Sequence, residues 1–193
     1  MNALDTKSNL IEERERQFAY LLASRVIQKP RLSVWMILVP IIFIYYFYRL
    51  NQYKAGRHEF VTNYMISRKR ALEAACRSLE TGTAADLDAL SEQAKLPVEV
   101  LPQYRSFLGA FNEYYLDLLQ AEGASFDALV RSAFKSKTDF LIRLNRFNQT
   151  EKELNTALKP HMADTTEGFS EVVSVMEQSS AELRRNAADQ IFV

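Results

Sequence analysis

The sequence predicts an all-α protein: one N-terminal membrane-associated helix, then a long stalk helix and an antiparallel helical bundle. Three observations support this fold class. Apolar residues recur at steps of three and four along most of the 193 residues, which is the period of one face of an α-helix. The chain has only 5 Gly and 5 Pro, too few for a turn-rich sheet protein. A run of 17 uncharged residues lies near the N-terminus.

Residues 1–31 are expected to form an amphipathic helix. Asn9 and Glu12 have the spacing of a capping box, and apolar residues at helical steps follow them to about Gln28. The polar side of this helix carries arginines. Such a helix lies on a membrane surface, docks on a partner helix or packs against the bundle of its own chain, and the sequence leaves these alternatives open.

Residues 32–48 are predicted to be a transmembrane or re-entrant segment. As a helix they would span about 26 Å, which is at the low end of what a hydrocarbon core of about 30 Å requires. Arginines flank the run, and aromatic residues stand near both of its ends, where membrane interfaces concentrate them. The predicted membrane-interface residues are Arg31, Trp35, Tyr45, Tyr46, Tyr48, Arg49, Lys54 and Arg57.

A single spanning helix is favoured over a re-entrant insertion and over a buried helix of a soluble bundle. Pro40 lies near the middle of the run, where it predicts a helix kink and keeps the re-entrant alternative open. Three basic residues stand close to the run on each side, so the positive-inside rule gives no orientation from them. Further out, Arg68, Lys69 and Arg70 favour a cytoplasmic C-terminal domain. The expected localisation is therefore the membrane, single-pass or monotopic.

Residues 49–80 are expected to form a juxtamembrane stalk helix, because Val61, Met65 and Leu72 recur on one face. Residues 49–70 carry six basic groups and one acidic group, whereas residues 71–193 carry twelve basic and nineteen acidic groups. A basic collar beside an apolar run suits anionic lipid headgroups. The alternative is a basic helix face that is only solvated.

Residues 81–193 are predicted to form the soluble helical bundle. A short helix ends at Pro97, and Pro102 suits the first turn of the next helix, which is expected to stop at Gly123. From there, apolar residues at steps of four and three predict one helix over residues 126–158. This helix provides a long apolar stripe for packing against its neighbours.

The final helix is expected to begin near Thr165 or Thr166, after Pro160. Its apolar stripe is thinner and flanked by serines. The predicted partner-helix seam consists of Phe169, Val173, Met176 and Leu183. This seam either completes the bundle, which is favoured, or pairs with another protein or a second copy of the chain.

Chemistry-bearing motifs are sparse. The chain has one cysteine and two histidines, and neither histidine has a metal-ligand spacing to another donor. No phosphate-binding glycine loop is present. No catalytic, cofactor-binding or metal-ligating residue is therefore predicted, and no small-molecule substrate is evident. The balanced net charge and the acidic C-terminal part argue against nucleic acid as a partner.

The sequence leads us to expect a non-enzymatic, membrane-anchored adaptor or accessory subunit that acts through helix–helix contacts. Its expected partners are membrane lipid and either another protein or a second copy of the chain. Two alternatives remain. One is a membrane enzyme or lipid-handling protein that engages headgroups through the tyrosines and the basic collar. The other is a sensor with a membrane rod.

Overall fold

The computed structural model describes residues 2–27, 57–161 and 166–193, and every regular element in these residues is helical. The predicted all-α helical bundle is confirmed. The helices are α1 (Ala3–Ile27), α3 (Arg57–Thr81), α4 (Leu87–Glu92), α5 (Leu101–Gln120), α6 (Phe126–Ala133), α7 (Lys137–Leu158) and α8 (Thr166–Ile191), with one 3-10 turn, η1 (Val98–Val100), before α5.

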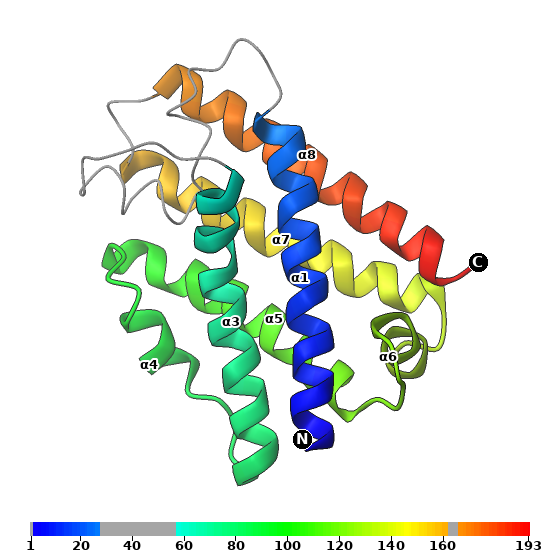
Figure 1. Ribbon diagram of the computed structural model, residues 1–193. Helices are drawn as coiled ribbons and strands as arrows, with labels where there is room; N and C mark the ends of the chain where they lie inside the picture. The colour runs from blue at the N-terminus through cyan, green and yellow to red at the C-terminus, as the bar shows by residue number, and fades with distance from the viewer. Residues whose placement is uncertain (1, 28–56, 162–165) are drawn as a thin grey trace.

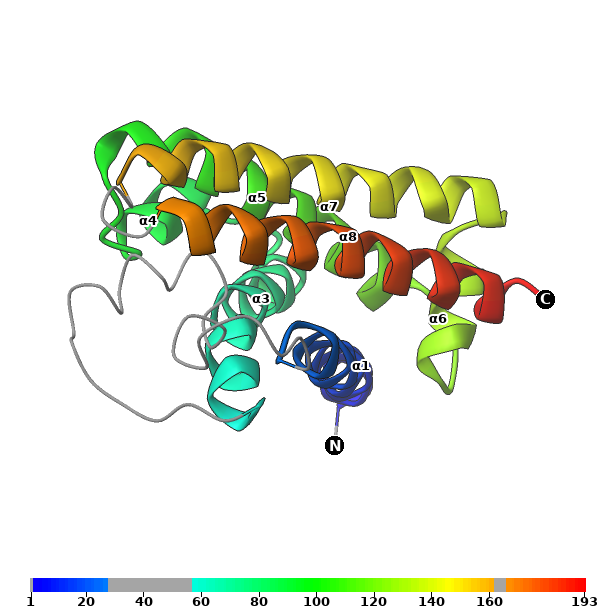
Figure 2. The same ribbon diagram turned by 90° about the horizontal axis from the view of Figure 1, so that it is seen from above.

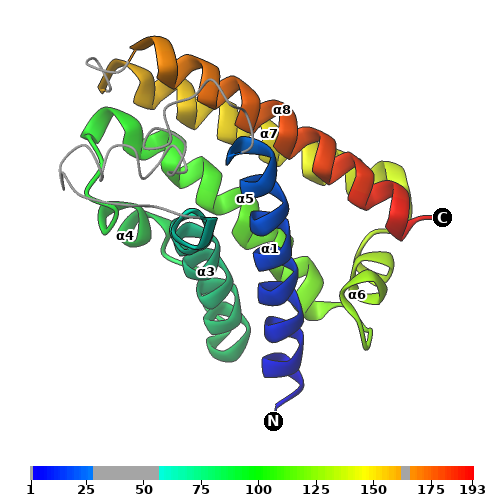
Figure 3. The ribbon, with the colours of Figure 1, turned by 45° about the horizontal axis from the view of Figure 1, so that its top comes forward.

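Four of the five long helices form two antiparallel pairs that cross. Helices α1 and α3 run side by side in opposite directions, and so do α7 and α8 (Figure 1). Seen from above, α7 and α8 run across the first pair, which is viewed nearly end-on (Figure 2). Helix α5 packs against both α3 and α7 and so lies between the pairs, with α4 and α6 at its sides (Figure 3). One continuous core results.

Aromatic rings of α5 and α7 form the centre of this core. Phe111 and Phe147 are stacked with their ring centroids 4.3 Å apart, and Tyr114 and Phe147 meet edge to face with their centroids 5.1 Å apart. Phe134 and Phe140 continue the cluster at 5.2 Å. Such pairs stabilise a fold by about 0.5–1.5 kcal/mol each beyond the burial of their area. The position of α5 against α7 is therefore strongly specified.

Pro102 lies in the first turn of α5, as predicted, and Ser125 caps α6 by accepting a hydrogen bond from Ala128 N at 3.3 Å. The prediction of one helix over residues 126–158 is wrong. Phe134 is extended, and Ser136 begins a new helix by accepting from Asp139 N at 3.1 Å. A serine side chain competes for backbone donors in this way, which interrupts a helix that the apolar spacing alone would continue.

Two predicted helix ends are also wrong. Helix α1 begins at Ala3 rather than at a capping box on Asn9, because Asn2 N bonds to Asp5 Oδ2 at 3.1 Å and so caps the helix earlier. Helix α5 ends at Gln120, not at Gly123. The turn after α5 then brings Gly123 close against the start of α6.

Helix α3 packs within the bundle. Val61, Met65 and Leu72 are all buried in the same core as the apolar residues of α5 and α7. The described part of the segment that was expected to act as a stalk therefore contributes directly to the bundle. The preceding residues 49–56 lie outside the described part of the chain.

The predicted membrane localisation, single-pass or monotopic with a cytoplasmic C-terminal domain, is corrected by the structure. Within residues 2–27, 57–161 and 166–193, no helix combines the length and the apolar character that crossing a bilayer requires. The segment on which the prediction was based, residues 32–48 with the predicted kink at Pro40, lies outside the described residues.

Replacing Gly123 with alanine is expected to destabilise the bundle. A Cβ atom at Gly123 would lie 2.8 Å from both Ala128 Cβ and Leu129 N. Neither atom can move away easily, because Leu129 N is part of the α6 backbone and Ala128 Cβ is bonded directly to it. Overpacking of this kind costs about 1–3 kcal/mol, and each kcal/mol lowers the Tm of a chain of this size by about 2–4 °C. Thermal unfolding followed by circular dichroism measures the effect.

Gly109→Ala is the matched control. The new methyl group meets only the end of the Leu87 side chain, at 3.3 Å, and alanine is favoured over glycine inside a helix by about 1 kcal/mol. Its Tm is expected to stay level or rise. Equal losses of Tm in the two variants would show that the turn before α6 is not tightly packed.

Candidate functional site

Two arginine side chains are buried where helices α1, α3, α7 and α8 meet. Arg68 of α3 is 3% exposed and Arg184 of α8 is 6% exposed. A buried charge destabilises a fold by several kcal/mol unless it is paired and hydrogen-bonded. The partners of these two guanidinium groups therefore constrain how the helices can pack.

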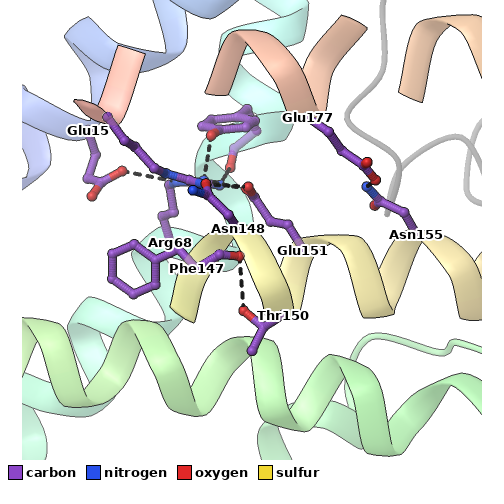
Figure 4. A network of polar contacts seen from close by, with 10 residues as sticks. Glu15, Arg68, Phe147, Asn148, Thr150, Glu151, Asn155 and Glu177 are labelled. Carbon is purple, nitrogen blue, oxygen red and sulfur yellow. Dashed lines mark hydrogen bonds and ion pairs between the residues drawn. The ribbon is translucent and has the colours of Figure 1, made fainter. Parts of the chain in front are cut away.

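Two glutamates compensate the arginines. Arg68 Nε donates to Glu15 Oε2 at 3.0 Å, and its Nη2 donates to Glu151 Oε1 at 3.2 Å. Arg184 Nη1 donates to the other oxygen of Glu151 at 2.7 Å. Figure 4 shows Arg68 between Glu15 and Glu151. We term these four residues the buried ion cluster. Their formal charges cancel.

Aromatic rings hold the guanidinium planes of the cluster. The guanidinium carbon of Arg68 lies 3.6 Å from the Tyr64 ring centroid and 4.6 Å from that of Phe111. Arg68 also donates to the Tyr64 hydroxyl. Arg184 lies 5.6 Å from the ring centroid of Phe147. Cation–π contacts of this type add orientation to the ion pairs, so the cluster and the aromatic core form one unit.

Glu151 and the two arginines of the cluster are ionised at neutral pH. Burial raises the pKa of Glu151, but the guanidinium groups of Arg184 and Arg68 outweigh burial and hold that pKa below its ordinary value of 4.5. Burial lowers the pKa of Arg68, while the neighbouring Tyr64, Glu15 and Glu151 raise it above its ordinary value. Burial also raises the pKa of Tyr64, so this hydroxyl stays protonated. The arrangement favours fixed charges over proton transfer.

A second feature is open to solvent. The start of α1 lies beside the end of α3 (Figure 1), and residues of both helices line a groove of about 720 Å³. We term it the α1–α3 groove. Its walls include Asp5, Ser8, Glu73, Cys76, Arg77 and Glu80. Asp5, Glu73 and Glu80 have no ion pair within the described residues, and neither has Arg77. The groove therefore carries an excess of negative charge.

Cys76 lies in this groove and is the one cysteine of the sequence. Its side chain is partly buried. Burial raises the pKa of the thiol, and a hydrogen bond with Ser8 offsets only part of that rise. Because the thiolate is the reactive form, the raised pKa argues against Cys76 as a nucleophile. It serves better as a reporter of groove occupancy than as a catalytic group.

Of the predicted membrane-interface residues, one lies in the described part of the chain. Arg57 is the first residue of α3. The others lie outside the described residues: Arg31, Trp35, Tyr45, Tyr46, Tyr48, Arg49 and Lys54.

The predicted partner-helix seam lies on α8. Met176 and Leu183 are buried in the core, and Val173 packs against it. Phe169 is in the first part of the same helix. The side chains of Val173, Met176 and Leu183 therefore complete the bundle of their own chain, which is the alternative that the sequence favours.

Sequence reasoning missed the buried ion cluster. A signal for it exists, because the charged residues stand at core-facing steps of their helices. Arg68 falls between the buried Met65 and Leu72, and Glu151 falls between the buried Phe147 and Leu154. A charge at such a position is compatible with burial only if a partner of opposite charge lies at the same depth.

No family model, curated protein or solved structure matches the chain. Function is therefore inferred from the described residues themselves. The buried ion cluster satisfies its charges internally, whereas the α1–α3 groove faces solvent with carboxylates that lack an ion pair within the described residues. The groove is the better candidate for contact with another molecule.

Glu151→Gln is expected to destabilise the fold strongly. It keeps the shape of the side chain but removes the charge that both buried arginines share. Breaking a buried pair in this way costs about 3–5 kcal/mol. Urea unfolding measures the loss. Glu153→Gln, on the exposed side of α7, is the control, and its effect is expected to stay within about 0.5 kcal/mol. A similar small change for Glu151→Gln would mean that the cluster contributes little.

The contribution of Glu151 is also expected to depend on pH. Because its pKa is lower in the folded chain than the ordinary 4.5, its stabilisation is present above that value and disappears as pH falls through the folded-state pKa. The difference in unfolding free energy between wild type and Glu151→Gln should therefore shrink below about pH 4.5. Urea titrations between neutral and strongly acidic pH measure this difference. A difference that stays constant would contradict the ionised cluster.

Proposed function

We propose that this chain is a non-enzymatic adaptor that binds a basic helical segment of a partner protein in the α1–α3 groove. The observation that carries the proposal is a solvent-facing groove of about 720 Å³ between two helices, with an excess of carboxylates on its walls. Helix-in-groove binding is a common mode of peptide recognition. Membrane attachment forms no part of this proposal.

The chemistry of the groove defines the occupant. Leu4 and Cys76 provide apolar surface, and Asp5, Glu73 and Glu80 provide negative charge. An amphipathic helix with leucine-like residues on one side and lysine or arginine along its edges complements both. Exposed ion pairs are worth only about 0–1 kcal/mol each. The charges therefore select the partner and its orientation, while apolar contact supplies most of the affinity.

The walls of the groove are held in place before any partner binds. Ile11 of α1 and Ala75 of α3 are buried in the core. Lys7 Nζ donates to Leu119 O at 3.0 Å and so ties α1 to the end of α5. The ion pair of Lys69 with Glu12, at 2.8 Å, links α1 to α3. A preformed site avoids the free-energy cost of ordering its own walls on binding.

The proposal is tested first by photo-crosslinking in cells. A photoreactive amino acid replaces Asn9, which lines the groove, and in a control protein it replaces Thr156 on the exposed side of α7. The captured peptides are identified by mass spectrometry. The expected result is a basic amphipathic segment captured at Asn9 and not at Thr156. Capture of this same chain at Asn9 would replace the proposal with self-association.

Charge reversal then tests the captured segment as a synthetic peptide with purified protein. Glu73→Lys combined with Glu80→Lys is expected to weaken binding at least about tenfold, equivalent to about 1.4 kcal/mol. The matched control is Glu153→Lys on α7, which is expected to leave the affinity unchanged. The same peptide should slow alkylation of Cys76. An affinity that is insensitive to reversal at the groove would overturn the proposal.

A further inference from the structure

A cavity of about 50 Å³ lies beside the buried ion cluster. Its lining comes from α1, α5, α6, α7 and α8, with Arg68 contributed by α3. Aromatic rings form much of its wall, including Phe18, Phe111 and Phe126. Such walls carry few hydrogen-bonding groups, so a polar occupant depends on the charged side chains that reach the cavity.

The charged side chains at the cavity do not balance. Arg14, Arg68, Arg184 and Glu15 all line it. Within the buried ion cluster, Arg68 and Arg184 are already compensated by Glu15 and Glu151. Arg14 has no ion pair or donated hydrogen bond within the described residues, and its guanidinium carbon lies 5.3 Å from the Phe126 ring centroid. One positive charge is therefore left over.

We propose that this cavity binds a small monovalent anion beside Arg14. A cavity needs about 10–15 Å³ of this volume to hold one water molecule, so about 50 Å³ accommodates an anion of only a few heavy atoms. Chloride and small carboxylates such as formate and acetate meet this limit. The guanidinium group matches carboxylate geometry, and its charge is more effective next to aromatic walls than in bulk water.

Because the site has a single excess positive charge, it is expected to favour monovalent over divalent anions. A monovalent anion neutralises Arg14 and leaves the buried ion cluster intact. A divalent oxyanion such as sulfate would bring one uncompensated negative charge to the side of Glu15, which lines the same cavity. It is also larger. Sulfate is therefore expected to bind much more weakly than acetate. This site is independent of the α1–α3 groove.

Chloride-35 NMR of the purified chain tests the proposal. A bound, slowly tumbling chloride broadens the solvent chloride signal, and a competing anion that displaces it reverses the broadening. Protein-dependent broadening is expected, with acetate reversing it at concentrations at least about tenfold lower than sulfate at equal ionic strength. Equal competition by acetate and sulfate would show screening of general surface charge and would overturn the proposal.

Variants on α1 locate the site. Arg14→Gln is expected to weaken chloride binding at least about tenfold. Arg16→Gln, which removes a surface arginine paired with Glu12 on the same helix, is expected to leave it unchanged. Arg14→Lys keeps the charge and should retain binding within about threefold, and circular dichroism checks that each variant is folded. Broadening that persists in Arg14→Gln, or that disappears equally in Arg16→Gln, would overturn the assignment to this cavity.

Discussion

The rest of the structure depends on the pairing of two buried arginines with Glu151. Apolar side chains distinguish less sharply between positions of one helix along another, because an apolar neighbour of similar size can replace another at modest cost. A buried guanidinium group does not tolerate such a shift of position, because separating it from its carboxylate costs several kcal/mol of folding free energy. Glu151 must therefore meet Arg68 of α3 and Arg184 of α8 together. Of the ways in which α3, α7 and α8 could pack through their apolar faces, only those that meet this condition avoid the penalty.

Helix α5 contributes no charge to the buried ion cluster and yet determines its surroundings. Phe111 lies under the guanidinium group of Arg68 and also stacks on Phe147, at 4.6 Å and 4.3 Å respectively. Phe147 in turn lies against Arg184. The aromatic core and the ion cluster therefore share the same rings. A change in the packing of α5 would move the rings that orient both arginines, so polar and apolar specificity cannot be separated in this bundle.

Local signals in the sequence predicted the helical class and most helix positions, because proline, serine caps and apolar period act over a few residues. Pro102 has the role expected of it in the first turn of α5. The break at Ser136 was missed because the apolar spacing continues across it.

The buried ion cluster was missed for a different reason. Arg68 and Lys69 were interpreted as one basic run, yet adjacent residues point about 100° apart on a helix, and these two side chains are 3% and 44% exposed. Which of the two side chains is buried depends on how helices distant in the sequence pack against α3, and the residues next to them in the sequence do not show this.

Both proposed sites include residues of α1, so the rigidity of this helix determines whether they influence each other. Arg14 lines the cavity, and Asp5 lies in the groove about two and a half turns earlier. Between them Ile11 is fully buried, and on either side Lys7 and Glu15 bond to other helices at 3.0 Å. An event at Arg14 could reach the groove only by moving the whole helix. The bond from Arg68 to Glu15 opposes that movement, because moving the helix would leave a buried charge without its partner. The cluster that aligns the bundle therefore also opposes coupling between the cavity and the groove, and we expect the two proposed sites to act independently as long as Arg68 stays paired.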